Sequence, residues 1–216
     1  MAIDYRKSSG PVEDASTATA PVSLTKERPS VPLTKQTGRL HINLSWQAAA
    51  PPGQGGLLRR LAPPRGIDLD LGCLYELTDG SKGVVQALGN SFGSLERPPY
   101  VWLNGDDRSG GGGEDLFVNL EHAAAIRRVL VFACIYDGAP SFEAAKGVVA
   151  LTPAAGPPIQ VRLDETSGSS RMCAIAMLEG APGGLSVRCE VRYVQGGQDV
   201  LDKEYGWGMT WSRGRK

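Results

Sequence analysis

The chain has 216 residues and a formal net charge of zero, because 23 lysines and arginines balance 23 aspartates and glutamates. This length allows one large domain or two small ones. The even balance argues against a nucleic-acid-binding surface, which needs clustered basic residues. No apolar run has the length of a membrane span, and the first residues lack the apolar stretch of a secretory signal. The four cysteines form no C-x-x-C pair, which favours buried thiols in a reducing cytosol.

The first part of the chain predicts a tail followed by short strands. Residues 1–20 are rich in Ser, Ala, Thr and Pro, and a segment with so little to bury is expected to be disordered. Segments 22–26 and 31–35 nearly repeat one another, and each predicts a brief edge strand, since Pro32 is tolerated only at a sheet edge. From Leu40 to Trp46 apolar and polar residues alternate without a break, the signature of a half-buried strand.

A second alternating run covers residues 67–78, after a loop rich in proline and glycine. Leucines occupy one face of this expected strand, while Asp68 and Asp70 share the other face, because side chains two apart on a strand project the same way. Asp79-Gly80 is a hairpin-type turn signal, and residues 84–88 form the expected return strand.

The segment from 105 to 115 (GDDRSGGGGED) places four carboxylates around a run of glycines. Such carboxylates repel one another unless a cation lies among them, and glycines allow tight turns that aim carbonyl oxygens inward. Oxygen ligands on a flexible loop suit Ca²⁺, although the spacing is not that of an EF-hand. The alternative is a solvated Gly-rich loop with acidic ends.

Later segments complete an all-β pattern. Residues 121–126 predict one helical turn, and residues 128–136 are apolar at nearly every position, which indicates a strand covered on both faces. Alternating runs follow at 159–163, 172–178 and 185–193. With no long helical periodicity, the sequence predicts a two-sheet antiparallel β-sandwich with one or two short helical turns. We expect a disordered tail over 1–20, one domain over 21–211 and a basic tail over 212–216.

Two other functions have to be weighed against metal binding. Residues 89–93 spell G-x-S-x-G, so Ser91 is a candidate hydrolase nucleophile with His122 as its base. The nucleophile elbow needs a following helix, and two prolines at 98–99 leave little room for one, so we expect no catalytic residue and no enzyme. Trp207 and Trp211 belong to an aromatic run that predicts a last strand packed on one face, or a carbohydrate-stacking platform.

Several motifs occur in the order found in the TerD family of tellurium-resistance and stress-response proteins, which the chain resembles over about residues 22–211. They are VSLTKE (22–27), NLSW (43–46), DLD (68–70), GDDRSG (105–110) and VFACIYD (131–137). Four more segments resemble the TerA branch of this family. They are LGCLYEL (71–77), QALGNSFG (86–93), RMCAIA (171–176) and YGWG (205–208).

The resemblance implies a β-sandwich that binds Ca²⁺ at one end and has no established catalytic reaction. It also implies a cytoplasmic protein, at most peripheral to the inner face of the membrane, that acts with other proteins of the tellurium-resistance system. The expected Ca²⁺ ligands are Asp68, Asp70, Asp106, Asp107, Glu114 and Asp115. Asp137, at a strand end, is a weaker candidate. Only two acidic residues follow the glycines, fewer than the family usually shows, so one ion is expected.

Overall fold

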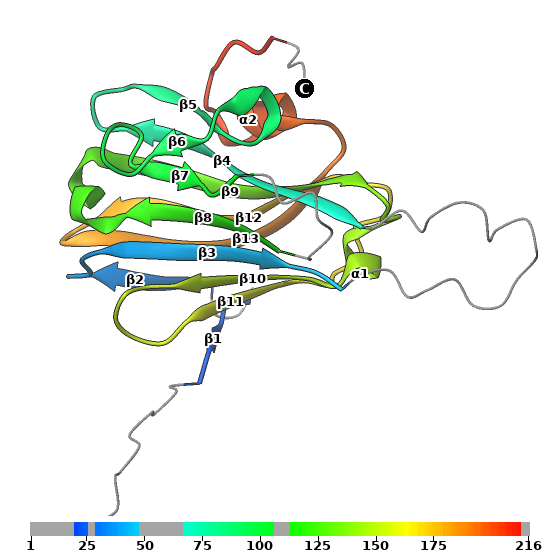
Figure 1. Cartoon of the computed structure of the whole chain (residues 1–216), viewed down its shortest axis with the longest axis horizontal. Coiled ribbons are helices and arrows are strands. Elements are labelled where there is room, and N and C mark those ends of the chain that lie inside the picture. Colours follow the sequence, from blue (N-terminus) through cyan, green and yellow to red (C-terminus); the bar gives the residue numbers. More distant parts are fainter. Residues whose placement is uncertain (1–19, 26–28, 48–66, 106–112, 213–216) are drawn as a thin grey trace, which may run out of the picture.

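The computed structural model describes residues 20–25, 29–47, 67–105 and 113–212, which form two stacked β-sheets (Figure 1). The first sheet has seven strands in the order β1-β11-β10-β3-β8-β7-β6. Its strands are β1 (Val22–Ser23), β3 (Arg39–Ser45), β6 (Gly93–Ser94), β7 (Val101–Leu103), β8 (Gly113–Asn119), β10 (Gly147–Thr152) and β11 (Ile159–Leu163).

The second sheet has six strands in the order β2-β13-β12-β9-β4-β5. Its strands are β2 (Ser30–Thr34), β4 (Asp68–Leu77), β5 (Lys82–Val85), β9 (Ile126–Asp137), β12 (Met172–Ala181) and β13 (Gly184–Val194). Among the described strands every pairing is antiparallel except that of β1 with β11. The predicted all-β, two-sheet antiparallel sandwich is therefore confirmed. The disordered tail expected over 1–20 and the basic tail expected over 212–216 lie mostly outside the described residues.

Helices are few and short in this part of the chain. They are η2 (Leu88–Asn90), η3 (Leu120–Ala125), α1 (Phe142–Ala145) and α2 (Gln198–Tyr205). The helical turn predicted over 121–126 is confirmed by η3. The last strand predicted through the aromatic run at 205–211 is wrong, because Tyr205 ends α2 and the chain continues without regular structure. Gly206 and Gly208 take φ values of 62° and 73°, a left-handed conformation that ends the helix and is incompatible with a strand.

The main core lies between the two sheets and follows the predicted alternation. In β3 the side chains of Leu40, Ile42 and Leu44 are fully buried, while the residues between them face outward. The two short strands predicted to be edges occupy edges, β1 in the first sheet and β2 in the second. Pro32 is tolerated in β2 because that strand pairs only with β13.

A second core covers the outer face of the six-stranded sheet. It combines strand residues with Leu201 of α2 and with Trp207, both fully buried. The strand residues are Leu74, Leu130, Phe132, Met172, Ala174, Met177 and Val194. The expectation that residues 128–136 form a strand covered on both faces is confirmed, since Val129 and Val131 belong to the first core and Leu130 and Phe132 to the second.

A buried carboxylate fastens the C-terminal segment to this outer face. Glu76 of β4 is 2% exposed and accepts hydrogen bonds from Arg127 (2.8 Å) and Arg128 (2.7 Å), with the Lys82 ammonium 3.8 Å away. The Arg128 guanidinium lies 3.8 Å from the centre of the Trp207 ring and donates to the carbonyl oxygens of residues 205 and 206. Glu76 thus orients the cation that closes the end of α2.

The ionisation of Glu76 makes stability depend on pH. Burial raises the pKa of this carboxyl, but the hydrogen bond from Arg128 and the charges of Arg128, Lys82 and Arg127 outweigh burial and hold the pKa below its ordinary value. A carboxyl whose pKa is lower in the folded state stabilises the protein above its ordinary pKa. That stabilisation is lost as the pH falls through the folded-state pKa.

We therefore expect Glu76→Gln to lower the free energy of unfolding by about 1–3 kcal/mol at neutral pH, because it removes charge-assisted hydrogen bonds from a buried site. The deficit should shrink as the pH falls through the acid range where wild-type Glu76 protonates. Urea unfolding at a series of pH values measures both effects. An equal deficit at every pH would show that the Glu76 charge contributes nothing.

Candidate functional site

Four strand ends meet at one end of the sandwich, where α1 also lies (Figure 1). Ser45, the last residue of β3, pairs with Gly113, the first of β8. In the other sheet Asp68, the first residue of β4, pairs with Asp137, the last of β9. The backbone of Gln47 donates to the carbonyl oxygen of Ala145, which links β3 to α1. We call this region the acidic end.

Asp70 lies on the outer face of β4, and Asp68 is the first residue of the same strand. Asp68 is partly buried, and Asp70 is only 9% exposed. The Cys134 thiol of β9 lies 3.8 Å from Asp70 Oδ2. Asp70 also lines a cavity of about 200 Å³ with Phe132 and Met172. Asp70, one of the first pair of predicted ligands, therefore lies at the edge of the second core.

Glu114 connects the two sheets. It is 4% exposed, and its Oε2 accepts a short hydrogen bond from the backbone N–H of Leu71 in β4. The pairing of β5 with β4 extends only to Cys73, so the Leu71 N–H lies on a stretch of the β4 edge that β5 does not cover. A carboxylate of the seven-stranded sheet thus satisfies a backbone donor of the six-stranded sheet, next to Asp70.

Asp115 faces the other way. Neighbouring residues of a strand project to opposite faces, so Asp115 lies on the outside of the seven-stranded sheet. Its Oδ1 accepts from Asn43 Nδ2 at 2.8 Å and lies 2.6 Å from His41 Nε2. The His41 ring stacks on Phe117, with centroids 4.7 Å apart. The structure does not bring the Asp115 carboxylate together with that of Glu114.

The predicted ligands are thus placed in three ways. Asp68 and Asp70 belong to the start of β4, where they pair with Asp137 and Cys134 of β9. Glu114 bonds to Leu71 of the same strand, while Asp115 is held on another surface. Asp106 and Asp107 lie outside the described residues. Within the described ranges no group of three or more His, Cys, Asp or Glu side chains is already arranged to hold a metal. The convergence of all six on one ion stays a prediction.

Ser91 has a structural role in this fold. Its Oγ donates to the carbonyl oxygen of Val84 at 2.7 Å, and its own carbonyl accepts from the N–H of Gln86 at 2.9 Å. The chain then enters β6 rather than the helix that a nucleophile elbow requires. His122 stacks on Tyr100, with centroids 4.1 Å apart. Ser91 therefore caps the exposed edge of β5.

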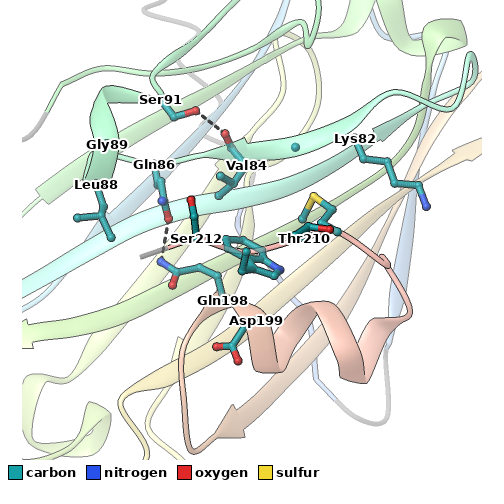
Figure 2. Close-up of a pocket in the computed structure, with 13 residues that line it drawn as sticks. Lys82, Val84, Gln86, Leu88, Gly89, Ser91, Gln198, Asp199, Thr210 and Ser212 are labelled. Atoms are coloured by element: carbon teal, nitrogen blue, oxygen red, sulfur yellow. Dashed lines mark hydrogen bonds between the residues drawn. The ribbon is translucent and has the colours of Figure 1, made fainter. Parts of the chain in front are cut away.

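The two tryptophans considered for carbohydrate stacking differ. Trp207 is fully buried and donates its indole N–H to the carbonyl oxygen of Tyr75, so it offers no surface to a ligand. Trp211 is partly exposed and lines a groove of about 860 Å³ between β5, the η2 turn, the start of α2 and residues 209–212 (Figure 2). We call this groove the C-terminal groove. Its lining residues come from separate elements, so no sequence motif reveals it.

Comparisons with known proteins agree with the motif order noted above. No family model matches the chain. Over 200 residues, 90% of the chain, the sequence is 45% identical to tellurium resistance protein TerA from Alcaligenes sp., and the chain spans 58% of that protein's length. This match confirms the predicted relationship with the tellurium-resistance family and its TerA branch. In the described part of the structure, no helix is both long and apolar enough to cross a membrane.

The Glu114 hydrogen bond predicts a difference between two neighbouring carboxylates. Glu114→Ala should lower the free energy of unfolding by about 1–3 kcal/mol in EGTA, because it leaves the buried Leu71 N–H without its acceptor. Asp115→Ala should cost less, because its partners are partly exposed and can bond to water. Urea unfolding of both variants measures this contrast. Equal losses would mean that Glu114 does not fasten the sheets.

Proposed function

We propose that this member of the tellurium-resistance family acts in tellurite resistance as a non-catalytic, Ca²⁺-binding β-sandwich. The observation that carries the resistance role is 45% identity to a tellurium resistance protein over nearly the whole chain. Because the chain spans 58% of that relative, the proposal concerns this domain and its contribution. The motif 68–70 lies at the acidic end, and the motif 105–110 precedes β8 in the sequence, so the family resemblance and the described carboxylates indicate the same region.

The donor set at the acidic end suits Ca²⁺. Asp68 and Asp70 of β4 and Glu114 of β8 offer carboxylate oxygens from both sheets near the start of β4, and in the sequence Asp106 and Asp107 fall between β7 and β8. Ca²⁺ accepts six to eight oxygen ligands in loose geometry, whereas Mg²⁺ requires a tight octahedron. Asp115 would join this set only by giving up its contacts with Asn43 and His41.

Bound Ca²⁺ would link β4 to the start of β8 across the sandwich, where Glu114 already makes one hydrogen bond. An ion that binds only the folded state stabilises the protein by mass action. Its affinity falls at acid pH, because the carboxylates must be ionised to bind it. We infer that the bound ion organises the acidic end for contact with other proteins of the tellurium-resistance system, in the cytoplasm or at the inner face of the membrane.

The alternatives receive less support from the geometry. A serine hydrolase would need Ser91 free to lose its proton to a base, but the hydroxyl is hydrogen-bonded to the Val84 carbonyl. The two histidines contact Asp115 and Tyr100 instead. Calcium-dependent carbohydrate binding through both tryptophans does not fit the burial of Trp207.

Calorimetric titration tests the metal site. We expect Ca²⁺ to bind the wild-type chain and raise its melting temperature, and Asp70→Asn to weaken binding by about tenfold or more, since a carboxylate ligand is worth at least ~1.4 kcal/mol here. Asp79→Asn is the matched control. Asp79 is an exposed residue of the β4–β5 turn, at the other end of β4, and it accepts hydrogen bonds from Ser81.

Identical melting in Ca²⁺ and in EGTA, with no heat of binding, would refute the metal site. A loss of binding in Asp79→Asn equal to that in Asp70→Asn would place the ion elsewhere.

Growth on tellurite tests the biological role separately. Expression of the chain with the other proteins of its resistance system should raise the tellurite concentration that a sensitive bacterium tolerates. Asp70→Asn combined with Glu114→Gln should remove most of this protection, while Asp79→Asn should retain it. Unchanged protection in the double variant would show that resistance does not depend on the acidic end.

A further inference from the structure

The C-terminal groove has the size of a small-molecule site and a wall that is already ordered. Its volume of about 860 Å³ lies within the range of ligand pockets. One wall is the segment 209–212, which one buried carboxylate fixes. Asp202 of α2 is 4% exposed, and it accepts from the backbone N–H groups of Gly208 and Met209 and from Trp211 Nε1, at 2.9, 2.9 and 3.0 Å. The polar edge of the Trp211 indole is thus satisfied, and its ring lines the groove.

Each charged group of the groove already has a partner, although Lys82 shares the Glu76 carboxylate with Arg127 and Arg128. The Lys82 ammonium donates to the Trp207 carbonyl oxygen at 2.7 Å and lies 3.8 Å from Glu76. The Asp199 carboxylate lies 3.7 Å from the ammonium of Lys203. A phosphate or carboxylate on a ligand would find no unpaired cation among the described lining residues. This pattern disfavours nucleotides and acidic ligands.

The edge of β5 is also partly closed to an incoming strand. Val84 and Gln86 turn backbone groups outward, and Ser91 already bonds to both, through its hydroxyl to Val84 and its carbonyl to Gln86. Strand addition needs a row of unpaired backbone groups along an edge. The short remaining edge at Lys82 offers too few unpaired backbone groups for a peptide to pair with β5.

The remaining polar groups can both donate and accept hydrogen bonds. Gln198 Nε2 donates to Gln86 Oε1 at 2.8 Å (Figure 2). This bond does not use the Gln86 amide N–H groups or the Gln198 oxygen, so a ligand can bond to them. Thr210 and Ser212 add hydroxyl groups, while Val84, Met209 and Trp211 add apolar surface. Hydroxyl groups of a ligand, which also donate and accept, match this lining. The adjoining cavity of about 200 Å³ shares Gln86, Leu88 and Gln198 with the groove.

We infer that the C-terminal groove binds a neutral saccharide, with a sugar ring stacked on Trp211 and its hydroxyls bonded to Gln86 and Gln198. A sugar ring combines an apolar C–H face with hydroxyls at its rim, and an indole ring beside carboxamides complements both parts. None of its three binding residues belongs to the proposed Ca²⁺ ligands, although one of those ligands, Asp70, lines the adjoining cavity.

Saturation-transfer NMR with D-glucose, N-acetyl-D-glucosamine, maltose, trehalose and AMP tests the inference. It is run on the full chain in EGTA, so that failure of the metal site does not affect the result. At least one sugar should show saturation transfer at millimolar concentration. AMP should bind no more tightly than that sugar. Trp211→Ala should weaken sugar binding by about tenfold, and Gln198→Ala should weaken it several-fold.

Trp102→Ala is the matched control, because Trp102 is a partly exposed tryptophan on the outer face of the other sheet, stacked on Phe117. The Trp102→Ala variant should bind sugars with the affinity of the wild type. Melting curves establish that each variant is folded, and Gln198→Ala keeps the test open if Trp211→Ala does not fold. The absence of transfer from every sugar, or binding that survives in both groove variants, or a clear preference for AMP would overturn the inference.

Discussion

The arrangement of this molecule depends on the burial of both faces of its six-stranded sheet. One face packs on the seven-stranded sheet, and the other is covered by α2 and the segment after it. β9 and β12 can therefore be apolar at almost every position. Polar side chains in the middle of such a sheet require partners. Glu76 finds them in Arg127 and Arg128, and through Arg128 the same cluster holds the carbonyl oxygens at the end of α2.

The same constraint concentrates acidic groups at one end of the sandwich. β5 is shorter than β4, so the first residues of β4 have an edge that none of the described strands covers. Glu114 reaches this edge from the opposite sheet, while the Asp70 carboxylate lies near the Cys134 thiol of β9. Carboxylates with so little exposure are stable when hydrogen-bonded or bound to a cation. In our account this end is suitable for an ion because β5 leaves the first part of the β4 edge unpaired.

Much of the fold could be predicted, because the alternation of apolar and polar residues along a strand indicates directly which side chains are buried. The strands over 40–46, 67–78, 159–163 and 185–193 follow from a period of two, and the doubly covered strand β9 follows from its unbroken apolar run. The aromatic run at 205–211 could not be interpreted this way. Alternating glycines and aromatics resemble a strand, but the positive φ angles of Gly206 and Gly208 and the bonds to Asp202 determine its path.

The candidate site was predictable only in part. The alternation correctly places Asp68 and Asp70 on one strand, β4. It does not reveal that Glu114 and Asp115 already belong to β8, where neighbouring residues face opposite sides, because the glycine run predicts a loop there. The C-terminal groove was not predictable, since Gln86 and Gln198 are 112 residues apart and meet only in the folded chain.

The most direct test of the acidic end is a Ca²⁺ titration of the ¹⁵N-labelled chain followed by its amide NMR signals. Our account predicts that the amides of residues 68–71, 113–115 and 137 shift together with added Ca²⁺. The amides of the β4–β5 turn at residues 78–81 should not move. Shifts confined to that turn or spread evenly over the chain, or no shifts at all, would contradict the claim that the ion binds where β4 begins.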